Sequence, residues 1–242
     1  MDIFTLGAIF GGAIIIGILA VLMGGTLFLS FPLFQLLCPQ LSAAAIVGTI
    51  KVGSVCRNLA ALRPIRASID WSVLWLAPIL CLGSVIGSWQ IVSFPDYVIL
   101  IVLVIGWLVQ EFGNRLRVSR SLLFVITFVI GVYGGIFGAG IMLLIMGLLA
   151  LTHQSLGDAR ASALLLGLLV SAVAVVMIWQ ANLINWPIAL VWATGSAIGG
   201  YIGGITVKNT IHWSESTQRW LVRGAFLIAF VVATWKLLFG TN

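Results

Sequence analysis

The chain has 242 residues, of which 62% are hydrophobic and 7% charged, and its mean hydropathy is +1.21. Soluble domains carry about 25% charged residues, so this composition excludes a soluble globular protein and indicates one that lies mostly in a lipid bilayer. The net charge of +6 would suggest nucleic acid as a partner of a soluble protein, but in a membrane protein basic residues act as orientation signals, and no nucleic-acid partner is expected.

The first predicted element is an apolar segment, residues 4–38, that is interrupted by Gly24, Gly25 and Thr26. It lacks the basic start of a signal peptide and is longer than the apolar part of one, so we expect no cleavage. Glycine readily adopts conformations that end a helix, so two helices should meet at these residues. Segments of spanning length, about 20 residues, follow at residues 41–62, 71–92 and 97–112.

The second half of the chain begins with another glycine-broken apolar segment, residues 122–152, interrupted between Gly134 and Gly140. One straight helix of this length would measure about 46 Å against a hydrocarbon core of roughly 30 Å, so two shorter helices are predicted. Further spans are predicted at residues 155–179, 186–207 and 220–238.

The two halves repeat one pattern at a spacing of 114 positions, from Gly17 to Gly131 and from Gly53 to Gly167. Internal duplication around interrupted helices is typical of secondary transporters, since unwound backbone inside a membrane is tolerated only where it lines a cavity or is buried in protein. Small residues at 83–88 and 199–204 also correspond, and we interpret them as sites of close helix packing.

Basic residues indicate the orientation of the chain, because Lys and Arg concentrate on the cytoplasmic side. They cluster as Arg57, Arg63 and Arg66; as Arg115, Arg117 and Arg120; and as Lys208, Arg219 and Arg223. The junctions at 93–96 and 180–185 hold neither Lys nor Arg and should be external. The segment 122–152 then starts and ends on the cytoplasmic side, so it is predicted to re-enter. The same argument makes 4–38 re-enter from outside, with both termini outside.

The predicted fold is therefore an all-α integral membrane protein with two inverted repeats, residues 1–120 and 121–242. Each repeat consists of one glycine-broken re-entrant helix pair, 4–38 or 122–152, and three transmembrane helices. Broken segments that crossed fully would make the repeats parallel and would place the last basic cluster outside, against the positive-inside rule.

A substrate site is predicted where the two broken segments meet near the midplane. Helix N-termini carry a positive partial charge and bind anions, although close packing alone would also explain the glycines. The candidate residues are Gly24, Gly25, Thr26, Gly138, Ala139 and Gly140.

Lys51 is predicted to lie about 15 Å along its helix, too deep for a lysine at the membrane interface. Ser54 and Asn58 share its helix face. We predict that Lys51 and Ser54 attract an anionic substrate; the alternative is a lysine that reaches toward a water-filled vestibule. Four other polar residues are candidates for coupling or gating: Gln40, Gln154, Asp158 and Arg160. The glutamines could instead be helix caps, and Asp158 and Arg160 an interfacial pair.

Enzyme chemistry is not expected. Cys38, Cys56 and Cys81 are widely spaced without neighbouring histidines, so no metal site or thiol relay is predicted, and no cofactor is expected. Neither a nucleophile with a base nor a Gly-x-x-x-x-Gly-Lys motif for ATP is present.

The chain resembles the sulfite exporter TauE/SafE family of permeases, also called TSUP. The resemblance rests chiefly on residues 131–140, Gly-Val-Tyr-Gly-Gly-Ile-Phe-Gly-Ala-Gly, and on residues 159–163. Weaker similarity to the family is found at Pro32 and at residues 45–49, 184–186 and 199–204. The resemblance implies ion-linked transport of sulfur-containing or carboxylated anions across the bacterial inner membrane. The family's runs of three glycines are shortened in this chain, to Gly24-Gly25-Thr26 and Gly138-Ala139-Gly140.

The expected function is secondary transport of a small anion such as sulfite, a sulfonate, thiosulfate or a carboxylate. Protons are the candidate coupling ion for this transport. A passive anion channel is the alternative. The expected partners are that anion and the lipid bilayer, and the oligomeric state stays open.

Overall fold

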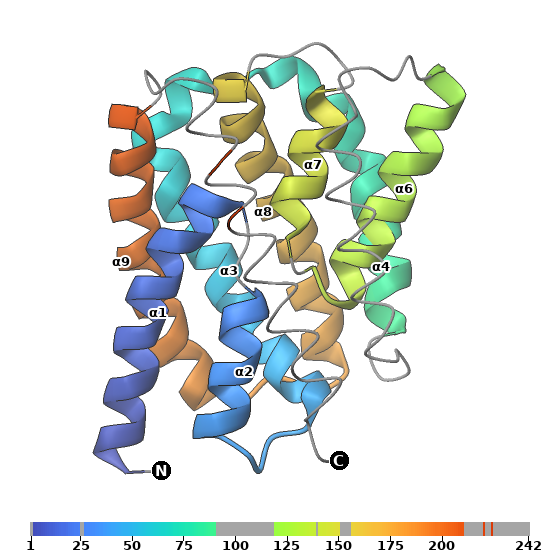
Figure 1. Ribbon diagram of the computed structural model, residues 1–242. Coiled ribbons are helices and arrows are strands. Elements are labelled where there is room, and N and C mark those ends of the chain that lie inside the picture. Colours follow the sequence, from blue (N-terminus) through green and yellow to red (C-terminus); the bar gives the residue numbers. More distant parts are fainter. Residues whose placement is uncertain are drawn as a thin grey trace.

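The computed structural model describes residues 2–24, 27–90, 119–138, 140–150 and 156–210, together with Trp220 and Gly224 (Figure 1). Across these residues the regular elements are helices, with no strand among them. Five segments are long and apolar enough to cross a membrane: Ile3–Leu22, Ala43–Ser68, Trp71–Trp89, Ala159–Gln180 and Trp186–Asn209. The last four agree with predicted spans. The predicted spans at 97–112 and 220–238 lie outside the described residues, apart from Trp220 and Gly224.

Helices α1 (Ile3–Met23) and α2 (Leu27–Leu37) form the first broken segment. The N–H of Gly24 donates to Ala20 O and its φ is 85°, a left-handed conformation that ends a helix and that glycine adopts without strain. The break predicted here is confirmed. The two parts are unequal, since α1 already contains a 20-residue apolar stretch of spanning length and α2 has 11 residues. The glycines before Gly24 lie inside α1 and do not interrupt it.

Helices α6 (Arg120–Ile136) and α7 (Ile141–Ala150) form the second broken segment. Ser119 caps α6 by accepting a hydrogen bond from Leu122 N–H at 3.3 Å. The break falls at 137–140, where Gly138 has φ 71° and Gly140 has φ 67°. The break lies within the predicted interval but is shorter, because Gly134 and Gly135, predicted to belong to it, lie in the last turn of α6.

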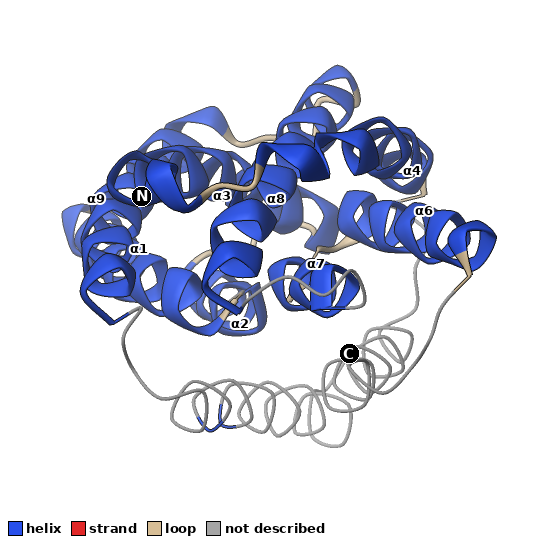
Figure 2. Ribbon diagram, turned by 90° about the horizontal axis from the view of Figure 1, so that it is seen from above, coloured by secondary structure: helices blue, strands red, loops and turns tan. Residues whose placement is uncertain are grey.

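The remaining helices are α3 (Ala43–Ile65), the short η1 (Arg66–Ser68) and η2 (Trp71–Leu76), α4 (Ala77–Trp89), α8 (Leu156–Gln180) and α9 (Trp186–Thr210). Figure 2 shows α3 and α8 at the centre, between an α1–α9 pair on one side and an α4–α6 pair on the other. The two central helices therefore separate the outer pairs.

Helices from the first half of the chain pack against helices from the second half. The first helix of each half packs on the fourth helix of the other half, α1 on α9 and α6 on α4. In Figure 1, α1 rises from the N-terminus at the bottom, whereas α6 descends from the top; α3 likewise rises and α8 descends. Thus α1 and α6 run in opposite directions, and so do α3 and α8.

Small residues allow both exchanged pairs to pack closely, as the sequence predicts. A Cβ placed on Gly17 of α1 would lie 3.0 Å from Ser196 O and 3.2 Å from the Cα of Gly199, both in α9. A Cβ on Gly83 of α4 would lie 2.5 Å from Phe128 O and 2.8 Å from Val132 N in α6. Such contacts involve backbone atoms, which cannot move without shifting the helix.

We expect Gly83→Ala to lower the stability of the protein by about 1–3 kcal/mol, the usual range for overpacking a tight contact. The measurement is the apparent melting temperature of the purified protein in detergent. Gly7→Ala is the matched control, because nothing lies within 4 Å of a Cβ at Gly7. Equal melting temperatures for the two variants would contradict the close α4–α6 packing.

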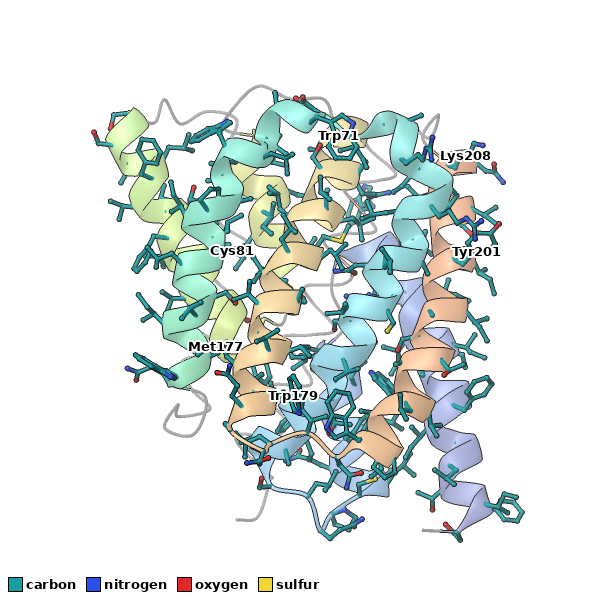
Figure 3. All side chains as sticks on the ribbon, turned by 180° about the vertical axis from the view of Figure 1, so that it is seen from behind. Trp71, Cys81, Met177, Trp179, Tyr201 and Lys208 are labelled. Carbon is teal, nitrogen blue, oxygen red and sulfur yellow. The ribbon has the colours of Figure 1, made fainter. Side chains whose placement is uncertain are left out.

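Figure 3 labels Trp71 and Lys208 at one end of the helices, with Trp179 nearer the other end. Trp71 is 60% exposed, Trp179 57% and Lys208 is exposed. Exposed tryptophans near helix ends are typical of residues at the membrane–water interface.

Candidate functional site

The two breaks contact each other. The N–H of Leu143, in the first turn of α7, donates to Gly24 O at 3.2 Å and to Gly140 O at 2.9 Å. The rings of Phe31 in α2 and Phe137 in the second break also meet edge to face, with centroids 5.8 Å apart. The predicted meeting of the glycine-broken segments is thus present in the geometry. The sequence analysis did not identify Leu143 or the Phe31–Phe137 pair as contacts between the breaks. Apolar residues in an apolar segment give no indication of which residues they will contact.

Lys51 reaches this junction from α3. Its side chain is 3% exposed, and its Nζ donates to the carbonyl oxygen of Gly134 in the last turn of α6. The N–H of Gly138 donates to Tyr133 O at 3.0 Å, and a Cβ on Gly138 would lie 2.8 Å from Lys51 Nζ and 2.9 Å from Gly134 O. Carbonyls at a helix C-terminus lack helical partners and carry negative partial charge, so an ammonium group suits this position.

The polar face predicted around Lys51 is only partly directed at the junction. The Ser54 hydroxyl donates to Ile50 O in its own helix at 3.3 Å. Asn58 is buried and accepts a hydrogen bond from Arg57 Nε at 3.1 Å, and its Nδ2 lies 3.6 Å from the position of a Cβ on Gly167 of α8. Asn58 therefore faces α8, and Ser54 has no hydrogen bond to either break in the described structure.

The other predicted site residues are distributed as follows. Gly25, Thr26, Ala139 and Gln154 lie outside the described residues. Gln40 is exposed in the turn after α2, and Asp158 lies in the first turn of α8, where its backbone alone is described. Arg160 is 7% exposed in the second turn of α8.

Two side chains that the sequence analysis did not single out tie the halves together. The Asp70 N–H, between η1 and η2, donates to Ser162 Oγ in α8 at 3.1 Å. The Asn185 N–H, just before α9, donates to Thr49 Oγ1 in α3 at 3.2 Å. Both bonds connect a loop of one half to a central helix of the other half.

Positive charge dominates the interior of the described structure. Lys51 and Arg160 are buried and Arg57 is half-buried, whereas the described carboxylates, Asp2 and Asp70, cap helix starts. Hydrogen bonds from the side chain and the N–H of Ser72 lower the pKa of Asp70 below its ordinary value. Within the described residues no carboxylate is paired with Lys51, and no group of three His, Cys, Asp or Glu could hold a metal ion. The arrangement suits an anion.

Comparison with protein families gives a match to the family described as sulfite exporter TauE/SafE, over residues 9–237. The chain belongs to the sulfite exporter TauE/SafE family. No similar curated protein and no similar solved structure was found. The TauE/SafE match includes both breaks, Lys51, four of the five apolar helices in full and most of Ile3–Leu22. The resemblance stated from the sequence is therefore confirmed, and the protein is a multi-pass membrane transporter.

Proposed function

We propose that this TauE/SafE protein is a secondary transporter that binds a small sulfite-type or carboxylate anion where its two broken segments meet. The observation that carries the proposal is Lys51, a cation that is 3% exposed, contacts Gly134 in the last turn of α6 just before the second break, and has no carboxylate partner among the described residues. A buried charge is expensive, and inside a membrane protein it usually marks a substrate or ion pathway. The family description adds sulfite as the first anion to test.

The proposed site combines the Lys51 ammonium group with the start of α7. Gly138, which has a positive φ, lies beside Lys51 Nζ and stands three residues before α7 (Ile141–Ala150). The N-terminal N–H groups of a helix attract anions, and a lysine adds a full charge. An arriving anion would compete with Gly134 O for Lys51, so binding would release one break from α3. Gly24, Gly25, Thr26 and Ala139 are proposed to complete the lining.

We also propose that residues 1–120 and 121–242 are inverted repeats whose broken segments enter from opposite membrane faces. The exchanged packing of α1 on α9 and α6 on α4 supports this, as do the opposite directions of equivalent helices (Figure 1). Lys208 lies in the last turn of α9, at the end shown at the top of Figure 1. Helix α3, which has Arg63 in its last turn, ends on the same side, and the N-terminus lies at the other end. The basic end is proposed to be cytoplasmic in a bacterial inner membrane.

Coupling to protons is proposed to involve Asp158 in the first turn of α8. A carboxylate in this position can take up and release a proton as the anion moves. Gln40 and Gln154 are proposed to gate the exits of the broken segments. A passive anion channel is the second candidate, and it differs in that it cannot move the anion against its gradient.

A thermal-shift screen of the detergent-solubilised protein tests the binding proposal. Sulfite, thiosulfate, a sulfonate and a carboxylate are compared at equal sodium concentration, and at least one of the anions is expected to raise the apparent melting temperature, because a ligand that binds only the folded state stabilises it. Sodium chloride at matched ionic strength is the control. Stabilisation by changes of cation alone, with none by any anion, would overturn the proposal.

A further inference from the structure

The sequence Ile-Asx-Trp occurs twice, at residues 69–71 and 184–186, and each copy follows one of the two central helices, α3 or α8. In both copies the Asx side chain caps the next helix. Asp70 Oδ1 accepts an N–H of η2 at 2.9 Å, and Asn185 Oδ1 accepts an N–H of α9 at 3.3 Å. The two loops therefore carry the same kind of helix cap, although they belong to different halves of the chain.

The backbone N–H of each capping residue bonds to a hydroxyl of the other half. Asp70, which follows α3, donates to Ser162 Oγ in α8 at 3.1 Å, and Asn185, which follows α8, donates to Thr49 Oγ1 in α3 at 3.2 Å. Asp70 and Asn185 are 115 positions apart, and Thr49 and Ser162 are 113 apart, close to the repeat of 114. The two bonds are thus equivalent, and each central helix is held by the loop that follows the other.

The two bonds lie at opposite ends of the fold. Thr49 is the seventh residue of α3 and Ser162 the seventh of α8. Because α3 rises and α8 descends in Figure 1, the bond to Ser162 lies at the basic end and the bond to Thr49 lies at the end of the N-terminus. Both hydroxyl-bearing side chains are fully buried, whereas Asp70 and Asn185 are half-buried. Each bond therefore joins a loop near the surface to the interior of the fold.

A hydrogen bond in such a position suits reversible closure. While its end of the protein is dry, the buried hydroxyl and the N–H need each other, because an unpaired buried polar group costs free energy. When water enters, water molecules can replace either partner at little net cost. Each bond therefore stabilises the closed form of its own end by a modest amount.

We propose that the two bonds are the latches of alternating access. The basic-end latch, between Asp70 and Ser162, breaks when the basic end opens, and the far-end latch, between Asn185 and Thr49, breaks when the opposite end opens. Each latch stays intact while the other is broken, as expected of two halves that rock against each other around a central site. The inference rests on the proposed transport function and adds to it the residues that control access. Both latches are intact in this structure.

Hydrogen–deuterium exchange of the purified full-length protein in nanodiscs tests the latches, by mass spectrometry of the peptides that contain Asp70 and Asn185. Ser162→Ala removes the acceptor of the basic-end latch, so exchange at Asp70 should become about two- to ten-fold faster, the effect of losing one hydrogen bond. The protein then spends more time with its basic end open, so exchange at Asn185 should become slower. Thr49→Val should give the reverse, with faster exchange at Asn185 and slower exchange at Asp70.

Thr194→Val is the matched control, because Thr194 Oγ1 donates to Leu190 O within α9, and its loss should leave both exchange rates unchanged. Thr49→Ser keeps the hydroxyl and should behave like the wild type. The double variant Thr49→Val with Ser162→Ala should restore the wild-type ratio of the two rates, because both open forms gain equally. If Thr49→Val is not recovered as a folded protein, Thr49→Ala removes the same hydroxyl and is judged by the same criteria.

Slower exchange at the distant loop is the reading that a merely structural bond would not produce. Unchanged or faster exchange there, in either single variant, would overturn the inference. The measurement uses no anion, so it is independent of sulfite binding. Reciprocal exchange together with normal sulfite affinity in Lys51→Met would contradict the proposed site and leave the latches standing, whereas loss of affinity in Lys51→Met without the distant effect would overturn the latches alone.

Discussion

Lys51→Met is expected to lower the apparent affinity for the transported anion by about 10- to 100-fold. A hydrogen bond to a charged group contributes about 1.5–3 kcal/mol, and 1.4 kcal/mol corresponds to a factor of ten. Methionine keeps a long apolar side chain, so the volume beside Gly134 and Gly138 stays nearly filled. The measurement is the concentration dependence of sulfite uptake into proteoliposomes.

Lys208→Met is the matched control for this variant. Lys208 is an exposed lysine at the end of α9, away from the breaks, so its replacement removes the same charge from the chain without touching the proposed site. Its apparent affinity should match that of the wild type. If the two lysine variants transport sulfite with equal apparent affinity, the assignment of Lys51 to the site is wrong.

Gly138→Ala is expected to destabilise the protein by about 1–3 kcal/mol and to abolish most transport. Gly138 has φ 71°, a conformation that costs other residues roughly this amount. The added Cβ would also lie 2.8 Å from Lys51 Nζ and 2.9 Å from Gly134 O, so it would disturb the contact that joins α3 to the second break. Apparent melting temperature and uptake are measured on the same preparations.

Gly11→Ala separates this local effect from a general effect of adding a methyl group to a helix glycine. Gly11 lies inside α1, and nothing is found within 4 Å of a Cβ at that position. Its replacement should leave both readings unchanged or raise the melting temperature slightly, since alanine favours a helix over glycine. A Gly138→Ala protein as stable and active as Gly11→Ala would show that the break needs no left-handed glycine.

The positions of the breaks could be predicted because they depend on local chemistry. Gly24, Gly138 and Gly140 interrupt apolar segments too long for one span, and they have the positive φ that glycine adopts without strain. The length of α1 was harder to anticipate, because glycine in a membrane helix either ends it, as Gly24 does, or packs against a neighbour, as Gly17 does against Gly199. Only the packing partner distinguishes these outcomes.

The partners of the buried cations could not be predicted. The depth of Lys51 in its helix follows from the sequence, but its contact with Gly134 O depends on how α3 is aligned against α6, more than 80 positions later in the chain. The burial of Arg160 also could not be predicted. Its position near a predicted span boundary suggests an interface residue, and only the packing of α8 against its neighbours shows that its side chain is buried.

Accumulation of radiolabelled sulfite in proteoliposomes with an imposed proton gradient tests the central claim most directly. Protein-free liposomes give the leak, and the Lys51→Met protein gives the uptake that does not pass through the proposed site. A secondary transporter with its site at the two breaks should raise internal sulfite above the external concentration, lose this excess when a protonophore is added, and fail to build it with Lys51→Met. Uptake that stops at equal concentrations on both sides, with or without the gradient, would contradict the account and identify a channel.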